Sequence, residues 1–195
     1  MRVVQVKCPR CQQPIYSKVK DLAFYCQHCR TMHIRNGGTN IIDFDIAEFG
    51  PNARGDRVYM PFWRLFSSFT INQANVAGGT FHKLSRMIKG TANGGNLFIY
   101  VPAWETAVDE FKRWSMGMTE GQPMYSLRQD FNNVERGPTA ITKEEAMQLA
   151  DFVVVTMEAE RPGTLQYLDY SLQVHDARLV YLPFVRGAQG LVPGL

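Results

Sequence analysis

Two Cys-x-x-Cys pairs constrain the fold of this chain more than any other feature of its sequence. Cys8 and Cys11 form the first pair, and Cys26 and Cys29 form the second after fourteen intervening residues. Two tight turns at this separation can present four thiolates to one tetrahedral metal ion. Strand-like residues precede each pair, and TMHI follows the second. The pattern therefore predicts an N-terminal zinc ribbon in which these four cysteines are the metal ligands.

A ligand set made only of thiolates favours zinc or iron. Rubredoxin-type iron sites usually carry glycine after the second cysteine of each pair, whereas this chain has Gln12 and Arg30 there. We therefore expect one structural zinc ion, with iron in a rubredoxin-like site as the alternative. Because four thiolates complete the tetrahedron, we expect His28 and His33 to lie beside the site or at the surface and not to bind the metal.

Charge and length place further bounds on the chain. It has 195 residues, enough for one domain plus a small module, and a formal net charge of +3. Residues 1–36 hold seven basic residues and one acid, a local charge of +6. No apolar run approaches the roughly 20 residues of a membrane-spanning helix, and four cysteines suited to a metal indicate a reducing compartment. We expect a cytoplasmic protein.

The remaining pattern predicts an α+β fold, with a mostly antiparallel sheet packed against two helices. We expect a zinc ribbon over residues 1–38 and an α+β domain over 39–195. Alternating residues predict strands near 41–49, 57–71, 97–103, 165–174 and 177–185, the last two forming a hairpin that turns at His175-Asp176. Helical spacing predicts helices near 105–118 and 143–160, and Thr142-Lys-Glu-Glu145 has the pattern of a capping box.

One short motif occurs three times, as VYMPFW from Val58, IYVPAW from Ile99 and VYLPFV from Val180. Proline cannot donate a hydrogen bond to a sheet, so each proline is expected at a strand end, a bulge or an edge. The tyrosine and proline of each copy are two residues apart and should share a face. We expect all three copies to cluster on one sheet, either as packing or as a surface for a partner.

The ribbon cysteines together with YMPFWRL, IYVPAW and ARLVYLPF resemble a group of uncharacterised bacterial zinc-ribbon proteins with Y-x-P-F-W-R and V-P-A segments. The resemblance covers most of the chain. It implies that Cys8, Cys11, Cys26 and Cys29 bind the metal, and it implies no catalytic residues.

The sequence lacks a recognisable nucleophile–base pair, phosphate loop or open metal site, so we expect no enzyme activity. The leading interpretation is a protein-binding adaptor or scaffold subunit in a larger bacterial assembly. The alternative is a nucleic-acid-binding protein that uses the basic ribbon. The candidate partner or anion surface comprises Arg10, Lys18, Lys20, Arg30, Tyr59, Pro61, Trp63, Arg64, Tyr100, Pro102, Tyr181 and Pro183.

Overall fold

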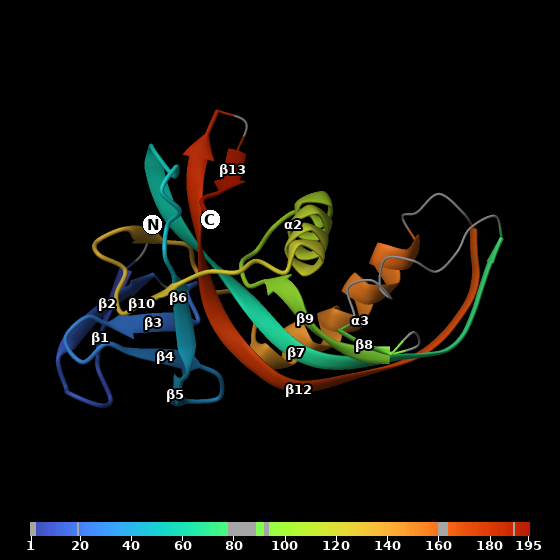
Figure 1. Ribbon diagram of the computed structural model, residues 1–195. Helices are drawn as coiled ribbons and strands as arrows, with labels where there is room; N and C mark the ends of the chain where they lie inside the picture. Colours follow the sequence, from blue (N-terminus) through green and yellow to red (C-terminus); the bar gives the residue numbers. More distant parts are fainter. Residues whose placement is uncertain (1–2, 19, 78–88, 92–93, 160–163, 189) are drawn as a thin grey trace.

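The computed structural model describes residues 3–18, 20–77, 89–91, 94–159, 164–188 and 190–195 (Figure 1). Within these ranges the fold is α+β, with two helices and mostly antiparallel sheets. The strands are β1 Val3–Lys7, β2 Pro14–Lys18, β3 Ala23–Cys26, β4 Thr31–Arg35, β5 Thr39–Ile42, β6 Phe44–Ala47, β7 Asp56–Ala77, β8 Lys89–Thr91, β9 Gly94–Pro102, β10 Leu127–Arg128, β11 Glu135–Arg136, β12 Thr164–Gly187 and β13 Gly190–Pro193, and the helices are α2 Val108–Gly121 and α3 Lys143–Ala159. Neither helix is long and apolar enough to cross a membrane.

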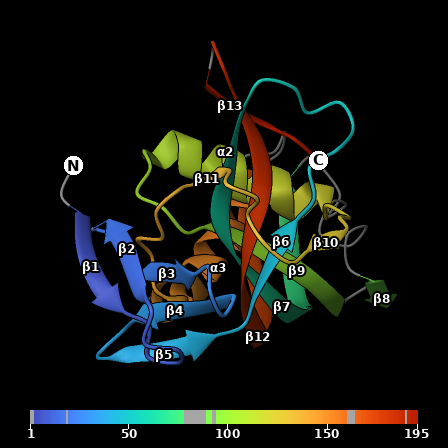
Figure 2. The same ribbon diagram turned by 90° about the vertical axis from the view of Figure 1, so that its left-hand side faces the viewer.

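The N-terminal ribbon consists of two small antiparallel sheets, β1-β2 and β3-β4-β5. β5 ends at Ile42 and β6 begins at Phe44, so the chain passes almost directly from the ribbon into the largest sheet (Figure 2). The single strand predicted near 41–49 is therefore wrong, because its two halves belong to different sheets. The β4–β5 pairing also spans the boundary expected between residues 38 and 39, so no break in the sheet occurs there.

Two long strands, β7 and β12, form the centre of the largest sheet and run side by side (Figure 1). Their antiparallel pairing extends from Asp56 opposite Arg186 to Ala77 opposite Thr164. β9 pairs with the other edge of β7, and β6 lies parallel to β12 on its other edge. The order of the strands is β10-β6-β12-β7-β9-β8.

The hairpin predicted to turn at His175-Asp176 does not exist, because β12 continues through both residues. The register against β7 shifts between Val174 and Asp176, which leaves His175 as the extra residue of a β-bulge. A bulge accommodates one unpaired residue and bends the strand without ending it. Polar residues that look like a turn in the sequence therefore mark a bulge in a continuous strand.

The three prolines of the repeated motif lie where strand neighbours change. On one edge of β7, β11 pairs as far as Tyr59 and β9 pairs from Phe62, which leaves Pro61 between them. On one edge of β12, β6 pairs as far as Tyr181 and β13 pairs from Phe184, which leaves Pro183 between them. Pro102 is the last residue of β9.

Pro102 is at a strand end, as expected. Pro61 and Pro183 lie inside long strands, but each has one edge without a ladder neighbour, which agrees with the expected alternative of an edge position. The carbonyls of Pro61 and Pro183 still accept hydrogen bonds from Ala103 and Gly194 at these edges. The absence of a proline N–H is tolerated there because no ladder strand stands opposite it.

The three tyrosines of the motif do not form one row. Tyr59 lies opposite Pro183 and Tyr181 opposite Pro61, because the first and third copies run antiparallel to each other. Tyr100 lies opposite Arg64 and so faces the other side of the sheet. Alternate residues of a strand face opposite sides, so a register shift of one residue is enough to reverse the face.

Burial excludes the repeated motif as an exposed surface. Its tyrosines and prolines, together with Trp63, are all buried within the chain itself: Tyr59, Pro61, Trp63, Tyr100, Pro102, Tyr181 and Pro183. The interpretation as packing is therefore the one that agrees with the structure.

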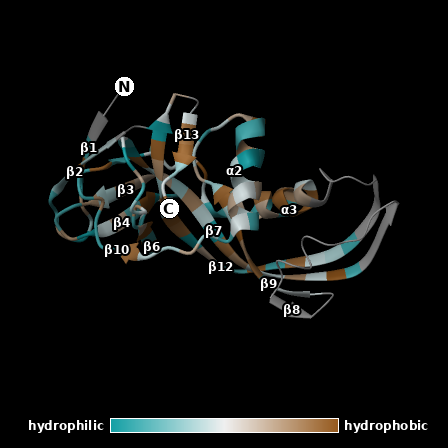
Figure 3. Cartoon of the chain, turned by 45° about the horizontal axis from the view of Figure 1, so that its top comes forward, coloured by the Kyte–Doolittle hydropathy of each residue, from teal (hydrophilic) through white to brown (hydrophobic). Residues whose placement is uncertain are grey.

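Each face of the largest sheet buries a separate core. One core holds Tyr59 and Tyr181 and is covered by α3 and by ribbon residues such as Met32. The other core holds Tyr100 and is covered by Trp114 and Met118 of α2. Hydrophobic residues gather where β7, β9 and β12 meet these helices (Figure 3).

The capping box at the start of α3 is confirmed, since the Glu145 N–H donates to Thr142 Oγ1 at 3.2 Å and the Thr142 N–H donates to Glu145 Oε2 at 2.7 Å. We expect Thr142→Ala to lower the free energy of unfolding by about 1 kcal/mol, because it removes an N-terminal cap. Urea denaturation measures this loss. Thr106→Ala is the matched control, since its hydroxyl reaches only exposed Glu110, and it should cost less than about 0.5 kcal/mol. Equal losses would contradict the cap.

Candidate metal centre

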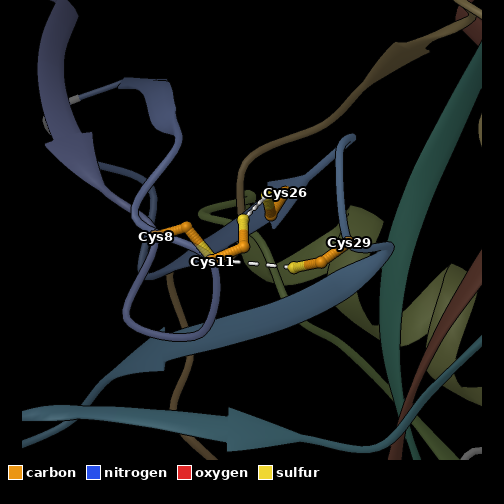
Figure 4. A group of neighbouring side chains, drawn as sticks. All are labelled: Cys8, Cys11, Cys26 and Cys29. Atoms are coloured by element: carbon orange, nitrogen blue, oxygen red, sulfur yellow. Dashed lines mark hydrogen bonds between the residues drawn. The ribbon is translucent and has the colours of Figure 1, made fainter.

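The two Cys-x-x-Cys turns bring four thiols into one cluster (Figure 4). The first turn lies between β1 and β2, and the second follows β3. The Sγ atoms of Cys8 and Cys29 are 3.6 Å apart, and those of Cys11 and Cys26 are 3.5 Å apart. All four Sγ atoms lie within 4.8 Å of one another.

These distances fit a metal ion at the centre of the cluster. A tetrahedral site with bonds of about 2.3 Å places its sulfur atoms about 3.8 Å apart. The four thiols therefore have the spacing and the chemical type to hold one ion, and this set suits zinc or iron. Cys8 and Cys26 are buried, whereas Cys11 and Cys29 are partly exposed.

The residue that follows each cysteine pair has a left-handed backbone. Gln12 has φ of 62° and Arg30 has φ of 54°. Glycine is favoured in this region because its lack of a Cβ removes the steric penalty. The turns thus have the shape that a following glycine favours, although the sequence places larger residues there.

The thiols differ in acidity. Burial raises the pKa of Cys26 to about 12. Burial acts in the same direction on Cys29, but hydrogen bonding with Thr31 and with the other thiols outweighs it and lowers the pKa to about 7. The Sγ of Cys29 lies 3.3 Å from Thr31 Oγ1. A metal ion must displace the protons that remain on these thiols, so binding depends on pH.

The two histidines near the second turn occupy different environments. His28 is exposed. His33 is fully buried, stacks on Phe24 with ring centroids 5.3 Å apart, and places Nε2 at 3.4 Å from Cys8 Sγ. Burial lowers the pKa of His33, which favours the neutral ring. A neutral His33 can donate from Nε2 to the Cys8 sulfur, which places it beside the cluster and outside the set of four thiols.

No protein-family model, curated protein or solved structure matches this chain. Similarity to zinc-ribbon proteins therefore rests on the four clustered cysteines themselves.

A buried ion pair joins the ribbon to the largest sheet. Asp21 precedes β3 and is 3% exposed, and Arg136 of β11 donates from Nη2 to Asp21 Oδ2 at 2.9 Å. Arg136 also donates from Nη1 to the Tyr181 hydroxyl at 2.8 Å. The other oxygen of Asp21 accepts from the backbone N–H groups of Thr139 and Ala23. Burial raises the pKa of Asp21, and the charge and hydrogen bonds of its partners oppose that rise.

Phe131 lies at the centre of the aromatic contacts between ribbon and sheet. The centroid of its ring lies 5.0 Å from that of Tyr25 in the ribbon. It lies 5.4 Å from the ring centroid of Tyr59 and 4.9 Å from that of Tyr181, both in the largest sheet. Neither this role of Phe131 nor the Asp21–Arg136 pair is evident from the sequence, because the partners are far apart in the chain. The one signal in the sequence is that Asp21 is the only acid in residues 1–36, which also hold seven basic residues.

The predicted basic residues of the ribbon have different partners, and among those with described side chains only Lys20 pairs with an acid. Arg10 donates to Thr31, Arg30 donates to Gln129, and Lys20 lies 3.6 Å from Glu105. The side chain of Lys18 lies outside the described residues. Arg64 lies far from this group in the sequence, on β7, where it pairs with Asp45.

Zinc affinity should rise with pH, and more steeply below about pH 7 than above it. Below that value zinc must displace a proton from Cys29 as well as from the other thiols, so the slope of log affinity against pH should change by about one. Competition with a chromophoric chelator measures the slope. Thr31→Val removes the hydrogen bond to Cys29 and should move the change to higher pH. A constant slope between about pH 6 and 8 would contradict this assignment.

Replacing Arg136 should destabilise the fold strongly, because it leaves Asp21 buried without its cation. We expect Arg136→Met to cost about 3–5 kcal/mol of unfolding free energy. The double variant Asp21→Asn, Arg136→Met should cost less than the sum of the single variants. Urea denaturation of the metal-loaded protein measures both. Arg186→Met is the control, since Arg186 pairs with Asp56 and Glu135 at the surface, and it should cost about 0–1 kcal/mol. Strict additivity would contradict the coupling.

Proposed function

We propose that this chain is a non-enzymatic zinc-ribbon protein that serves as an adaptor or scaffold subunit in a larger bacterial assembly. The observation that carries the proposal is the closed cluster of four thiols. Four sulfur ligands fill a tetrahedral ion, so no position remains for water or substrate. The metal then stabilises the two turns and the strands that they join.

Zinc is the ion that we propose for this cluster. A closed set of four thiolates is typical of structural zinc, and the buried approach of His33 to Cys8 supplies a neutral donor beside a negatively charged centre. Metal analysis of the protein purified from its native host distinguishes zinc from iron. A ferric thiolate site would also give a coloured protein.

The described residues give little support for catalysis. Outside the cysteine cluster, the described residues come nearest to a nucleophile–base pair at Ser68 Oγ, which lies 2.8 Å from His175 Nε2. His175 is exposed on the bulge of β12, and among the described residues no carboxylate hydrogen-bonds its other ring nitrogen. A Ser–His pair without an orienting group and a water-excluding site lacks what nucleophilic catalysis needs.

Exposed apolar side chains support a role in protein binding. Val108 of α2 is 65% exposed, and Phe152 of α3 is 42% exposed. Met124 and Leu127, which follow α2, are 95% and 60% exposed. Exposed apolar side chains of this size can contribute contacts in a protein interface.

Affinity purification from the native host under gentle conditions tests the adaptor role. We expect a companion protein at fixed stoichiometry with the wild-type chain. Cys11→Ser, Cys29→Ser should reduce its recovery, because the ribbon then loses its metal. Purification of the wild type as a monomer without any companion would contradict the proposal.

Nucleic-acid binding through the ribbon is the alternative that the same preparation tests. It would give affinity for DNA or RNA that falls steeply with salt and depends on Arg10 and Lys20. The absence of binding at low salt would exclude it.

A further inference from the structure

A cavity of about 680 Å³ lies on the α2 side of the largest sheet, beyond the C-terminal end of that helix. Its volume is in the range of sites that hold a small ligand or a few residues of a peptide. Its lining includes Arg64, Phe66, Phe98, Met124, Tyr125 and Arg178. These residues come from three adjacent strands of the sheet and from the segment after α2.

The polar end of the cavity has two arginines and one carboxylate. Asp45 is 7% exposed, and its two oxygens accept from Arg64 Nη2 at 3.2 Å and from Arg178 Nη1 at 3.1 Å. Arg64 also donates to the Tyr125 hydroxyl and lies over the Phe98 ring. Asp45 and Arg64 are therefore occupied, and the three groups together carry a net charge of +1.

Arg178 is the group with capacity left for a ligand. Its side chain is 38% exposed, and its hydrogen bond to Asp45 uses Nη1 alone. No hydrogen bond to its Nε or Nη2 occurs among the described residues. These two nitrogens form the side of the guanidinium that binds a carboxylate through two parallel hydrogen bonds.

Apart from Asn96 and Gln122, the rest of the cavity lining is mainly apolar and aromatic. Phe66 and Phe98 face each other across β7 and β9, with ring centroids 5.3 Å apart, and both are partly exposed. Arg178 pairs with Arg64, which is two residues from Phe66, so Arg178 and Phe66 are diagonal neighbours. Diagonal positions on adjacent strands are about 7–8 Å apart. That is a span that the carboxylate and the side chain of one residue can cover together.

We propose that this cavity binds the C-terminal residue of a partner protein chain, with its carboxylate on Arg178 and its apolar side chain against Phe66, Phe98 and Met124. The inference deepens the proposed adaptor function, on which it rests, by naming the kind of partner segment.

The charge distribution favours this ligand over nucleic acid. A single strand of DNA or RNA needs a basic groove along its backbone and accessible aromatic faces. Here one guanidinium has donors to spare, and Arg64 already covers Phe98 at 4.9 Å. A ligand with a single negative charge and an apolar body matches the cavity.

Two further acids affect how tightly Arg178 can bind an anion. Hydrogen bonding and charge from Asp45 raise the pKa of Arg178, and Asp43 and Asp176 add weaker attraction. Both of these acids are exposed. Asp176 should weaken the binding of an anion at Arg178, so Asp176→Asn gives a variant expected to bind more tightly.

Calorimetry with the full chain and two acetylated tetrapeptides tests the proposal. Both peptides have the same sequence and end in Leu-Phe. One has a free C-terminal carboxylate, and the other has a C-terminal amide. We expect the free acid to bind about tenfold or more tightly than the amide, because it alone makes charged hydrogen bonds with Arg178. Arg178→Gln should remove the difference, Arg178→Lys should restore part of it, and Asp176→Asn should increase it.

Arg186→Gln is the matched control at an exposed arginine far along β12 and should change nothing, while thermal unfolding verifies that each variant is folded. Equal binding of acid and amide, no binding of either, or tighter binding of a mononucleotide or an oligothymidylate would overturn the proposal. If Arg178→Gln still recovers the native companion in full, the adaptor role stands and this cavity is not its contact.

Discussion

The antiparallel pairing of β7 with β12 is the interaction on which the rest of this fold depends. The two strands pair from Asp56 and Arg186 to Ala77 and Thr164. β6, β9, β11 and β13 pair with their outer edges, and β10 and β8 pair in turn with β6 and β9. Pro61 and Pro183 lie where those edges exchange one neighbour for another. Because a proline has no N–H to donate, these positions separate consecutive neighbours along one continuous strand.

The ribbon is attached to that sheet by buried polar groups as well as by apolar packing. Arg136 contacts Asp21 of the ribbon and Tyr181 of β12 with the same guanidinium. Phe131 packs between the tyrosines of both parts. A metal ion in the cysteine cluster would stabilise β3 and β4, and thereby hold Met32 in the core beneath the sheet. Met32 and Tyr181 belong to the same core.

Local patterns in the sequence predict the parts of the fold that local interactions decide. The spacing of the cysteines predicts the cluster, the Thr142–Glu145 box predicts the start of α3, and alternation predicts the regions of β7, β9 and β12. The turn expected at His175-Asp176 is wrong, because a bulge and a turn use similar residues and only the partner strand distinguishes them. The three copies of the motif do lie on one sheet, as expected, but Tyr100 faces the other side, because its face depends on the register of β9.

By itself, the sequence determines the cluster of four thiols, since cysteines of suitable spacing can meet through two local turns. It also determines that three strands carry the tyrosine–proline motif. Only the tertiary structure decides that these tyrosines are buried, that Asp21 meets Arg136, and that two nitrogens of Arg178 have no hydrogen bond among the described residues. Each of these contacts joins residues from separate strands or loops, so it depends on register and burial, which no local pattern encodes.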